Sequence, residues 1–96
     1  MNPSKREALR TALFSVIDQQ IQDNTPPETK ITYNRLIASG ESHEDAYRLI
    51  GSVVTTEIFS VLKEGREYDE QAYIQALQAL PKLPWSNDKE NRKPGD

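Results

Sequence analysis

The chain has 96 residues, 35% of them hydrophobic and 28% charged, and its twelve basic and fifteen acidic residues give a formal net charge of −3. This length and composition predict one small soluble domain, and the mildly acidic balance argues against nucleic acid or anionic lipid as a partner. Because the chain contains no cysteine, disulfides, thiolate metal sites and cysteine nucleophiles are all excluded.

A first helix is predicted over residues 3–23. Asn2 is a candidate N-cap, and Pro3 stands at the first helical position, where its missing N–H would have no helical partner. Apolar residues then recur at steps of three and four, which places them on one face of the helix. These residues are Leu9, Ala12, Leu13, Val16, Ile17 and Ile21.

A second, shorter helix is predicted over residues 26–39. Thr25 can cap it, Glu28 can complete a capping box, and Pro26 occupies the first turn, where proline is tolerated. Gly40 suits the left-handed turn that ends many helices. The apolar residues of this helix are Ile31, Tyr33, Leu36 and Ile37.

The third helix, predicted over residues 43–64, is expected to be the central element. Ser42 can cap it, and between Leu49 and Leu62 the only charged residue is Glu57. A helix this apolar should be covered on more than one side, and Gly51 should let a neighbouring helix come close. Its main stripe is Ala46, Tyr47, Ile50, Val54, Ile58 and Val61, and further apolar residues are Leu49, Val53, Phe59 and Leu62.

The segment at residues 53–56, Val-Val-Thr-Thr, is β-branched and is compatible with a strand. The length of the apolar run and the lack of turn residues around it favour a helix. A fourth helix is predicted over residues 70–80, with Asp69 as its N-cap and Pro81 as its stop. The segment Leu83-Pro84-Trp85 is expected to lie as a strap across the bundle.

These elements predict an all-α fold, a four-helix bundle-like domain over residues 1–85. Residues 86–96 contain no apolar side chain and are predicted to form a disordered tail. The first ten residues lack the apolar stretch of a signal peptide, and no run approaches the ~20 apolar residues that span a bilayer. We therefore expect a cytoplasmic protein that does not associate with a membrane.

Residues 43–47, H-E-D-A-Y, come close to the zinc-binding sequence H-E-x-x-H. That motif needs two imidazoles one helical turn apart, but Tyr47 stands in the second place and His43 is the only histidine in the chain. A metalloprotease site of this type is therefore excluded. The favoured interpretation is a helix start, in which Glu44 and Asp45 lie at the positive end of the helix dipole. The alternative is a weaker metal site at His43.

Glu57 is the second candidate because it lies on or beside the buried stripe of the third helix. A buried carboxylate must be paired, hydrogen-bonded or protonated. One interpretation is a glutamate at the edge of the stripe, which reaches water or pairs with an arginine or tyrosine. The other is a polar centre that holds an ion, in which Asp18 and His43 would join Glu57.

Other functional patterns are weak. Residues 35–40 followed by a capped helix resemble the turn of a helix-turn-helix, but Glu44 and Asp45 would repel phosphate at the start of the second helix. No serine lies in a nucleophile-elbow pattern, and no glycine-rich phosphate loop is present. We therefore expect no nucleic-acid partner.

Residues 14–80 resemble a known family through a set of short landmarks. These are Ile17-Asp18-Gln19-Gln20-Ile21, Pro26-Pro27-Glu28, Arg35-Leu36, Gly40 before His43-Glu44, Ala46, Ile50-Gly51, Glu57-Ile58, and Asp69 with Tyr73. With them the chain resembles small helical bacterial proteins that are classified only as a domain of unknown function. The resemblance implies an all-helical fold and a histidine–carboxylate cluster at the bundle centre, with metal binding as its expected role.

The chain departs from that family pattern at the histidines. Phe14 stands where relatives often have one histidine, and Tyr47 replaces another, whereas Asp18, His43 and Glu57 remain. This departure suggests a site that has been lost or converted to hydrogen bonding among Tyr47, Glu57 and Asp18. The resemblance implies no known activity.

Two functions from different classes remain open. The first is a non-enzymatic bacterial protein that acts through protein–protein contact, with a protein partner or as a homodimer, because the third helix is too apolar for this short chain to cover. The second is a metal-binding or hydrolytic protein that uses Asp18, His43 and Glu57, with Tyr47 as a hydrogen-bond partner at the same site. No cofactor is expected. The second function requires the side chains of Asp18, His43 and Glu57 to converge.

Overall fold

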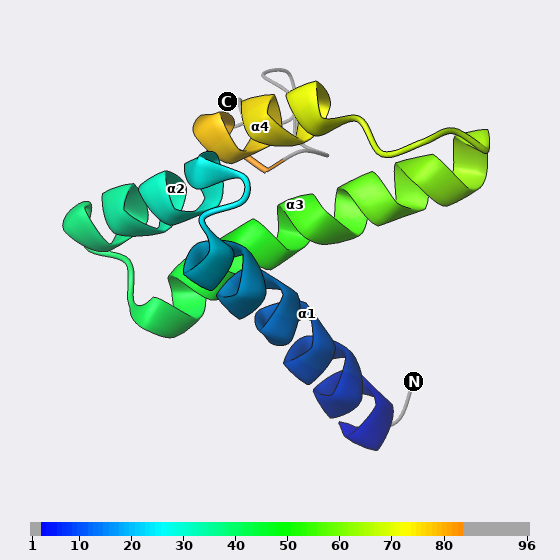
Figure 1. Ribbon diagram of the computed structural model, residues 1–96. Helices are drawn as coiled ribbons and strands as arrows, with labels where there is room; N and C mark the ends of the chain where they lie inside the picture. The colour runs from blue at the N-terminus through cyan, green and yellow to red at the C-terminus, as the bar shows by residue number, and fades with distance from the viewer. Residues whose placement is uncertain (1–2, 84–96) are drawn as a thin grey trace, which may run out of the picture.

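The structure is a computed structural model that describes residues 3–83, and within them it contains four α-helices and no strand (Figure 1). The helices are α1 (Pro3–Asp23), α2 (Pro27–Ala38), α3 (His43–Glu64) and α4 (Glu70–Ala79). The predicted all-α fold is confirmed, and the β-branched segment at residues 53–56 is helical. The predicted tail and Pro84-Trp85 of the predicted strap lie outside the described residues.

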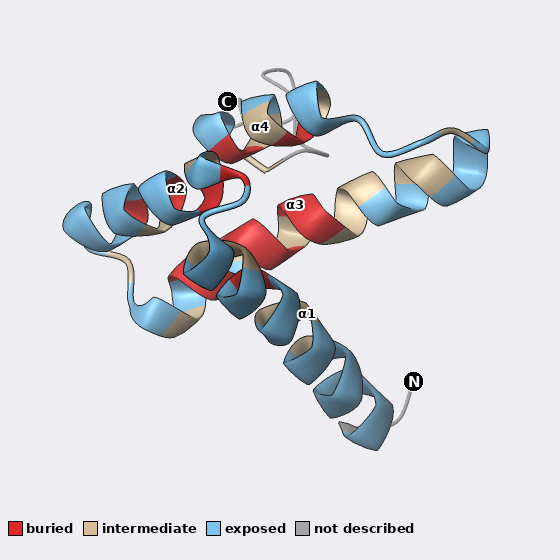
Figure 2. Ribbon diagram, viewed as in Figure 1, coloured by how far each residue is buried: buried red, intermediate tan, exposed pale blue. Residues whose placement is uncertain are grey.

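Helix α3 is the central element, as predicted, because it packs against α1, α2 and α4. The core lies around its N-terminal half, where the other three helices meet it (Figure 2). Each large apolar side chain that is fully buried there stabilises the fold by about 1.5–3 kcal/mol. The core residues are Ile17, Leu36, Ala46, Tyr47, Ile50, Val53, Val54, Tyr73, Leu77 and Leu80.

Two helical segments extend beyond this core. Figure 1 shows the N-terminal half of α1 and the C-terminal half of α3 diverging from the point where the two helices pack. Figure 2 shows both of these segments as a mixture of exposed and intermediate residues. We call residues 4–16 the α1 arm and residues 55–64 the α3 arm. The expected cover on more than one side is therefore found in the first half of α3, and large apolar residues of its second half are exposed.

Helix length explains why neither α2 nor α4 covers the α3 arm. Helix α3 has 22 residues and is about 33 Å long, whereas α2 and α4 have 12 and 10 residues and are only about 18 and 15 Å long. The two shorter helices cover the first half of α3 and end before its second half. In the α3 arm, Ile58, Phe59 and Leu62 are 48%, 66% and 73% exposed.

The helix ends follow the sequence signals in α3 and α4 but not in α2. The Ser42 hydroxyl accepts a hydrogen bond from the Asp45 N–H at 3.0 Å, and the Asp69 carboxylate accepts one from the Ala72 N–H at 3.1 Å. The capping box predicted at the start of α2 is wrong. The N-cap there is Pro26, which has no side-chain acceptor, and the Thr25 hydroxyl instead donates to the Asp23 carbonyl at 3.0 Å.

Two polar contacts that the sequence patterns did not indicate join the helices around the core. The Gln20 side-chain carbonyl accepts hydrogen bonds from the Thr29 hydroxyl at 2.7 Å and the Tyr73 hydroxyl at 2.9 Å, which links α1 to α2 and α4. The Arg35 guanidinium donates to the carbonyls of Leu80 at 2.7 Å and Leu77 at 3.1 Å. A cation at this helix end satisfies carbonyls that have no helical partner.

Candidate functional site

The degenerate metal motif folds into an aromatic cluster around Tyr47. This residue is only 5% exposed, and its ring meets the Phe14 and Tyr33 rings edge-on at centroid distances of 5.1 and 5.6 Å. The His43 ring lies 4.4 Å from it at an interplanar angle of 35°. The Tyr47 hydroxyl donates a hydrogen bond to the Asp18 carboxylate. Tyrosine at the motif's last position therefore packs as a core residue and forms a hydrogen bond between α3 and α1.

His43 lies at the exposed rim of this cluster, at the first position of α3. Its Nδ1 is 2.9 Å from the Tyr33 hydroxyl, so the imidazole already has a hydrogen-bond partner from α2. Asp18 is likewise engaged by Tyr47. The structure thus brings two of the predicted site residues, Asp18 and His43, to the same aromatic cluster, where each is hydrogen-bonded to a different tyrosine.

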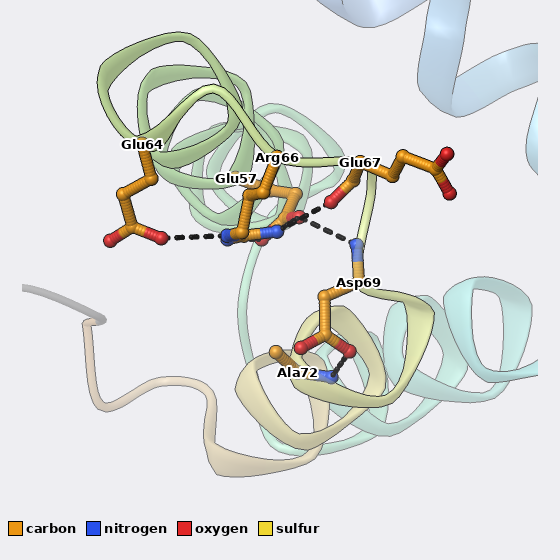
Figure 3. A network of polar contacts seen from close by, with 6 residues as sticks. All are labelled: Glu57, Glu64, Arg66, Glu67, Asp69 and Ala72. Atoms are coloured by element: carbon orange, nitrogen blue, oxygen red, sulfur yellow. Dashed lines mark hydrogen bonds and ion pairs between the residues drawn. The ribbon is translucent and has the colours of Figure 1, made fainter.

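Glu57, the third predicted site residue, lies elsewhere. It follows Tyr47 by ten residues in the same helix, which separates them by about 15 Å along the helix axis. Its carboxylate binds the Arg66 guanidinium through two contacts, at 3.0 and 3.3 Å, and accepts the Asp69 N–H at 2.9 Å (Figure 3). The hydrogen bond from Arg66 lowers the pKa of Glu57, against an opposing effect of burial.

The Glu57 contacts form part of a network at the turn between α3 and α4. Figure 3 shows Arg66 lying between Glu57 and Glu64, and its guanidinium also donates to the Glu67 carbonyl at 2.8 Å. The Asp69 backbone binds Glu57, while its side chain caps α4. Of the two interpretations of Glu57, pairing with an arginine is therefore the one observed. The network fixes where α4 starts relative to α3.

The side chains of Asp18, His43 and Glu57 do not converge, as a metal site formed by these three residues would require. Asp18 and His43 lie beside Tyr47, and Glu57 lies in the Arg66 network. Within residues 3–83, no group of three or more histidine, aspartate or glutamate side chains is arranged to hold a metal ion. The sequence suggests that Tyr47, Glu57 and Asp18 form hydrogen bonds with one another in place of a metal site. The structure contains the bond between Tyr47 and Asp18, but Glu57 does not take part.

A second candidate site is an open groove of about 700 Å³ between α1 and α3. Its lining surface is mostly apolar. Two of its lining residues, Arg10 of α1 and Arg48 of α3, both bind Glu44, and the Arg48 contact is 3.2 Å long. The groove residues are Arg6, Glu7, Leu9, Arg10, Leu13 and Phe14 of α1 and Arg48, Gly51, Ser52 and Thr55 of α3.

The groove continues onto the exposed apolar face of the α3 arm. Residues at spacings of three, four and seven lie on one face of a helix. Thr55 lines the groove, and three large apolar residues follow it at those spacings. We call this set the α3 ridge: Ile58, Phe59 and Leu62. The sequence pattern places Ile58 on the main stripe of the helix and Phe59 and Leu62 beside it, as apolar surface that a short chain would not cover fully. The structure shows all three residues exposed.

No described helix is both long and apolar enough to cross a membrane. Comparisons of the chain with protein-family models, with curated proteins and with solved structures found no match.

Proposed function

We propose that this protein is a non-enzymatic binding protein of the bacterial cytoplasm, and that it contacts a protein partner through the groove and the α3 ridge. The supporting observation is the exposure of three adjacent large apolar residues, Ile58, Phe59 and Leu62, next to that groove. Soluble proteins rarely expose contiguous apolar surface of this kind without a binding partner.

The composition of the surface suits a protein interface. Phenylalanine and arginine are enriched at interfaces, where a buried apolar centre is surrounded by a polar rim. Here the apolar centre comprises Phe59 and Leu62, and Arg6, Arg10 and Arg48 lie along the groove. A groove between two helices with an apolar lining is the kind of site that accepts a further amphipathic helix.

The chemistry of the first candidate site also favours binding over catalysis. The three residues of the predicted metal site are occupied by other contacts: Asp18 by Tyr47 and His43 by Tyr33 in the aromatic cluster, and Glu57 by Arg66 at the turn after α3. Tyr47 is buried, and a general acid or base must reach its substrate directly or through one water. These contacts give Asp18, His43 and Glu57 structural roles.

Site-specific photo-crosslinking in cells tests the proposed function. Phe59 is replaced by photo-reactive benzoylphenylalanine, and Gln75, which is exposed on α4, receives the same group as the control. We expect an adduct of one defined mass at position 59 that a second substitution, Leu62→Lys, abolishes. Absence of an adduct at position 59, or an equal adduct at position 75, would contradict a protein-binding role for this surface.

A further inference from the structure

We infer that the partner at this surface is a second copy of the same chain, whose α1 arm packs against the α3 ridge of the first copy. This inference rests on the proposed function and specifies its partner. It follows from the apolar faces, the charges and the helix ends of the two arms.

Both halves of the required interface occur in one chain. The α1 arm exposes Leu9 (50%) and Val16 (42%), which lie on one helical face with the groove residue Leu13. The α3 arm exposes its ridge. In a dimer with two-fold symmetry, every contact occurs twice, so the α1 arm of each copy covers the α3 ridge of the other. One association therefore buries both sets of apolar residues in both copies.

The charges of the two arms are complementary. Residues 4–10 of α1 contain three basic residues and one acidic residue, whereas residues 57–70, at the end of α3 and in the following turn, contain five acidic residues and two basic ones. Opposite net charges favour contact between these two segments and oppose contact of either segment with its own copy. This pattern selects pairing of α1 with α3 over pairing of α1 with α1 or α3 with α3.

The helix dipoles favour the same pairing. The N-terminus of a helix has a partial positive charge and the C-terminus a partial negative charge. Within one chain, the N-terminal end of α1 and the C-terminal end of α3 diverge (Figure 1). A second copy that crosses the first antiparallel places the positive end of its α1 beside the negative end of α3, where the net charge of residues 57–70 is also negative.

Light scattering coupled to size-exclusion chromatography tests the inference directly. At micromolar concentration the expected mass is about twice the chain mass of 10.9 kDa. Leu9→Lys and Leu62→Lys should each reduce the mass to that of one chain, because each places a charge in one half of the interface. Gln75→Lys is the matched control and should remain a dimer. A monomer for the unmodified chain at this concentration overturns the inference.

Disulfide trapping tests which arms contact each other. Because the chain contains no cysteine, every disulfide that forms must involve the introduced cysteines. A Leu9→Cys chain is mixed with a Leu62→Cys chain and oxidised mildly. We expect disulfides between position 9 and position 62, and fewer between two copies of position 9. A mixture in which disulfides between two position-9 cysteines predominate would overturn the pairing of α1 with α3.

The two proposals fail in distinguishable ways. A monomer in solution, together with a photo-adduct at position 59 whose mass excludes a second copy of this chain, overturns the dimer and leaves the proposed binding function standing. Absence of any adduct at position 59 overturns both.

Discussion

At the residue scale, Tyr47 occupies the position of a metal ligand in the H-E-x-x-H pattern but belongs to the helical core. A histidine at this position would present a nitrogen to a metal, whereas Tyr47 places its ring among Phe14, Tyr33 and His43. Its hydroxyl needs a partner because the residue is buried, and Asp18 supplies one. Burial, with Asp18 as the further cause, raises the pKa of Tyr47 well above its ordinary value of 10.0.

We predict that Tyr47→Phe reduces the free energy of unfolding by about 1 kcal/mol at pH 7, because the ring packing remains and one hydrogen bond is lost. Above pH 10 the unfolded chain releases the Tyr47 proton while the folded chain retains it, so the unmodified protein loses stability as the pH rises. The free energy of unfolding of the Tyr47→Phe variant should fall less between pH 10 and 11 than that of the unmodified protein. Urea unfolding at both pH values measures this, and an equal alkaline decline would contradict it.

Glu57 gives the opposite pH dependence. Arg66 lowers the pKa of Glu57 below its ordinary value of 4.5, so its contribution to stability is present above that pH and is lost as the pH falls through the lowered pKa. We predict that Glu57→Gln lowers the free energy of unfolding by about 1 kcal/mol at pH 7. The difference in free energy of unfolding between this variant and the unmodified protein should become smaller towards pH 3.

Glu64→Gln is the matched control for Glu57→Gln, because Glu64 binds the same arginine but its side chain is 58% exposed, against 12% for Glu57. Exposed ion pairs contribute little, so this variant should unfold close to the unmodified protein. Equal losses in the two variants, measured by urea unfolding, would mean that the buried position of Glu57 does not matter.

At the element scale, the glycine inside α3 and the glycine at its C-cap have different roles. Gly51 lies inside the helix, and a Cβ added there would be 4.0 Å from the Ile17 side chain, an ordinary van der Waals contact. Gly65 follows the helix with φ +63°, which a residue with a Cβ adopts at a cost. The expected close approach of a neighbouring helix at Gly51 therefore leaves space for a methyl group.

We predict that Gly51→Ala raises the free energy of unfolding by about 0.5–1 kcal/mol, because alanine favours the helix and no clash opposes it. Gly65→Ala should lower it by roughly 1 kcal/mol, because its backbone is left-handed. Chemical denaturation of both variants measures the pair. A loss of stability in Gly51→Ala would show that α1 and α3 need the glycine to pack.

At the scale of the whole molecule, stability and self-association are expected to be linked. If two chains bury each other's arms, the folded state is stabilised by mass action, and the melting temperature depends on protein concentration. We predict that Tm rises when the concentration of the unmodified protein is raised about 100-fold from the micromolar range, and stays constant for Leu62→Lys. Differential scanning calorimetry measures both, and a constant Tm for the unmodified protein would contradict the linkage.

Much of this architecture could be predicted from the sequence. The four helices, the Ser42 and Asp69 caps and the central position of α3 depend on apolar spacing and on contacts within one turn, which a linear pattern encodes. The lack of cysteine and the single histidine exclude whole classes of site by composition alone, since the ligands and nucleophiles that those sites need are missing from the chain.

Contacts between residues that are far apart in the sequence could be known only from the tertiary structure. It paired Glu57 with Arg66, joined Asp18 to Tyr47, and used Gln20 to bridge three helices. Within residues 3–83 no helix covers the α3 ridge, because the helix lengths and the divergence of α1 from α3 determine which apolar residues of α3 the other helices contact. A period of 3.6 residues places side chains on one face of a helix, but it does not determine which neighbour meets that face or how far along the helix the contact extends.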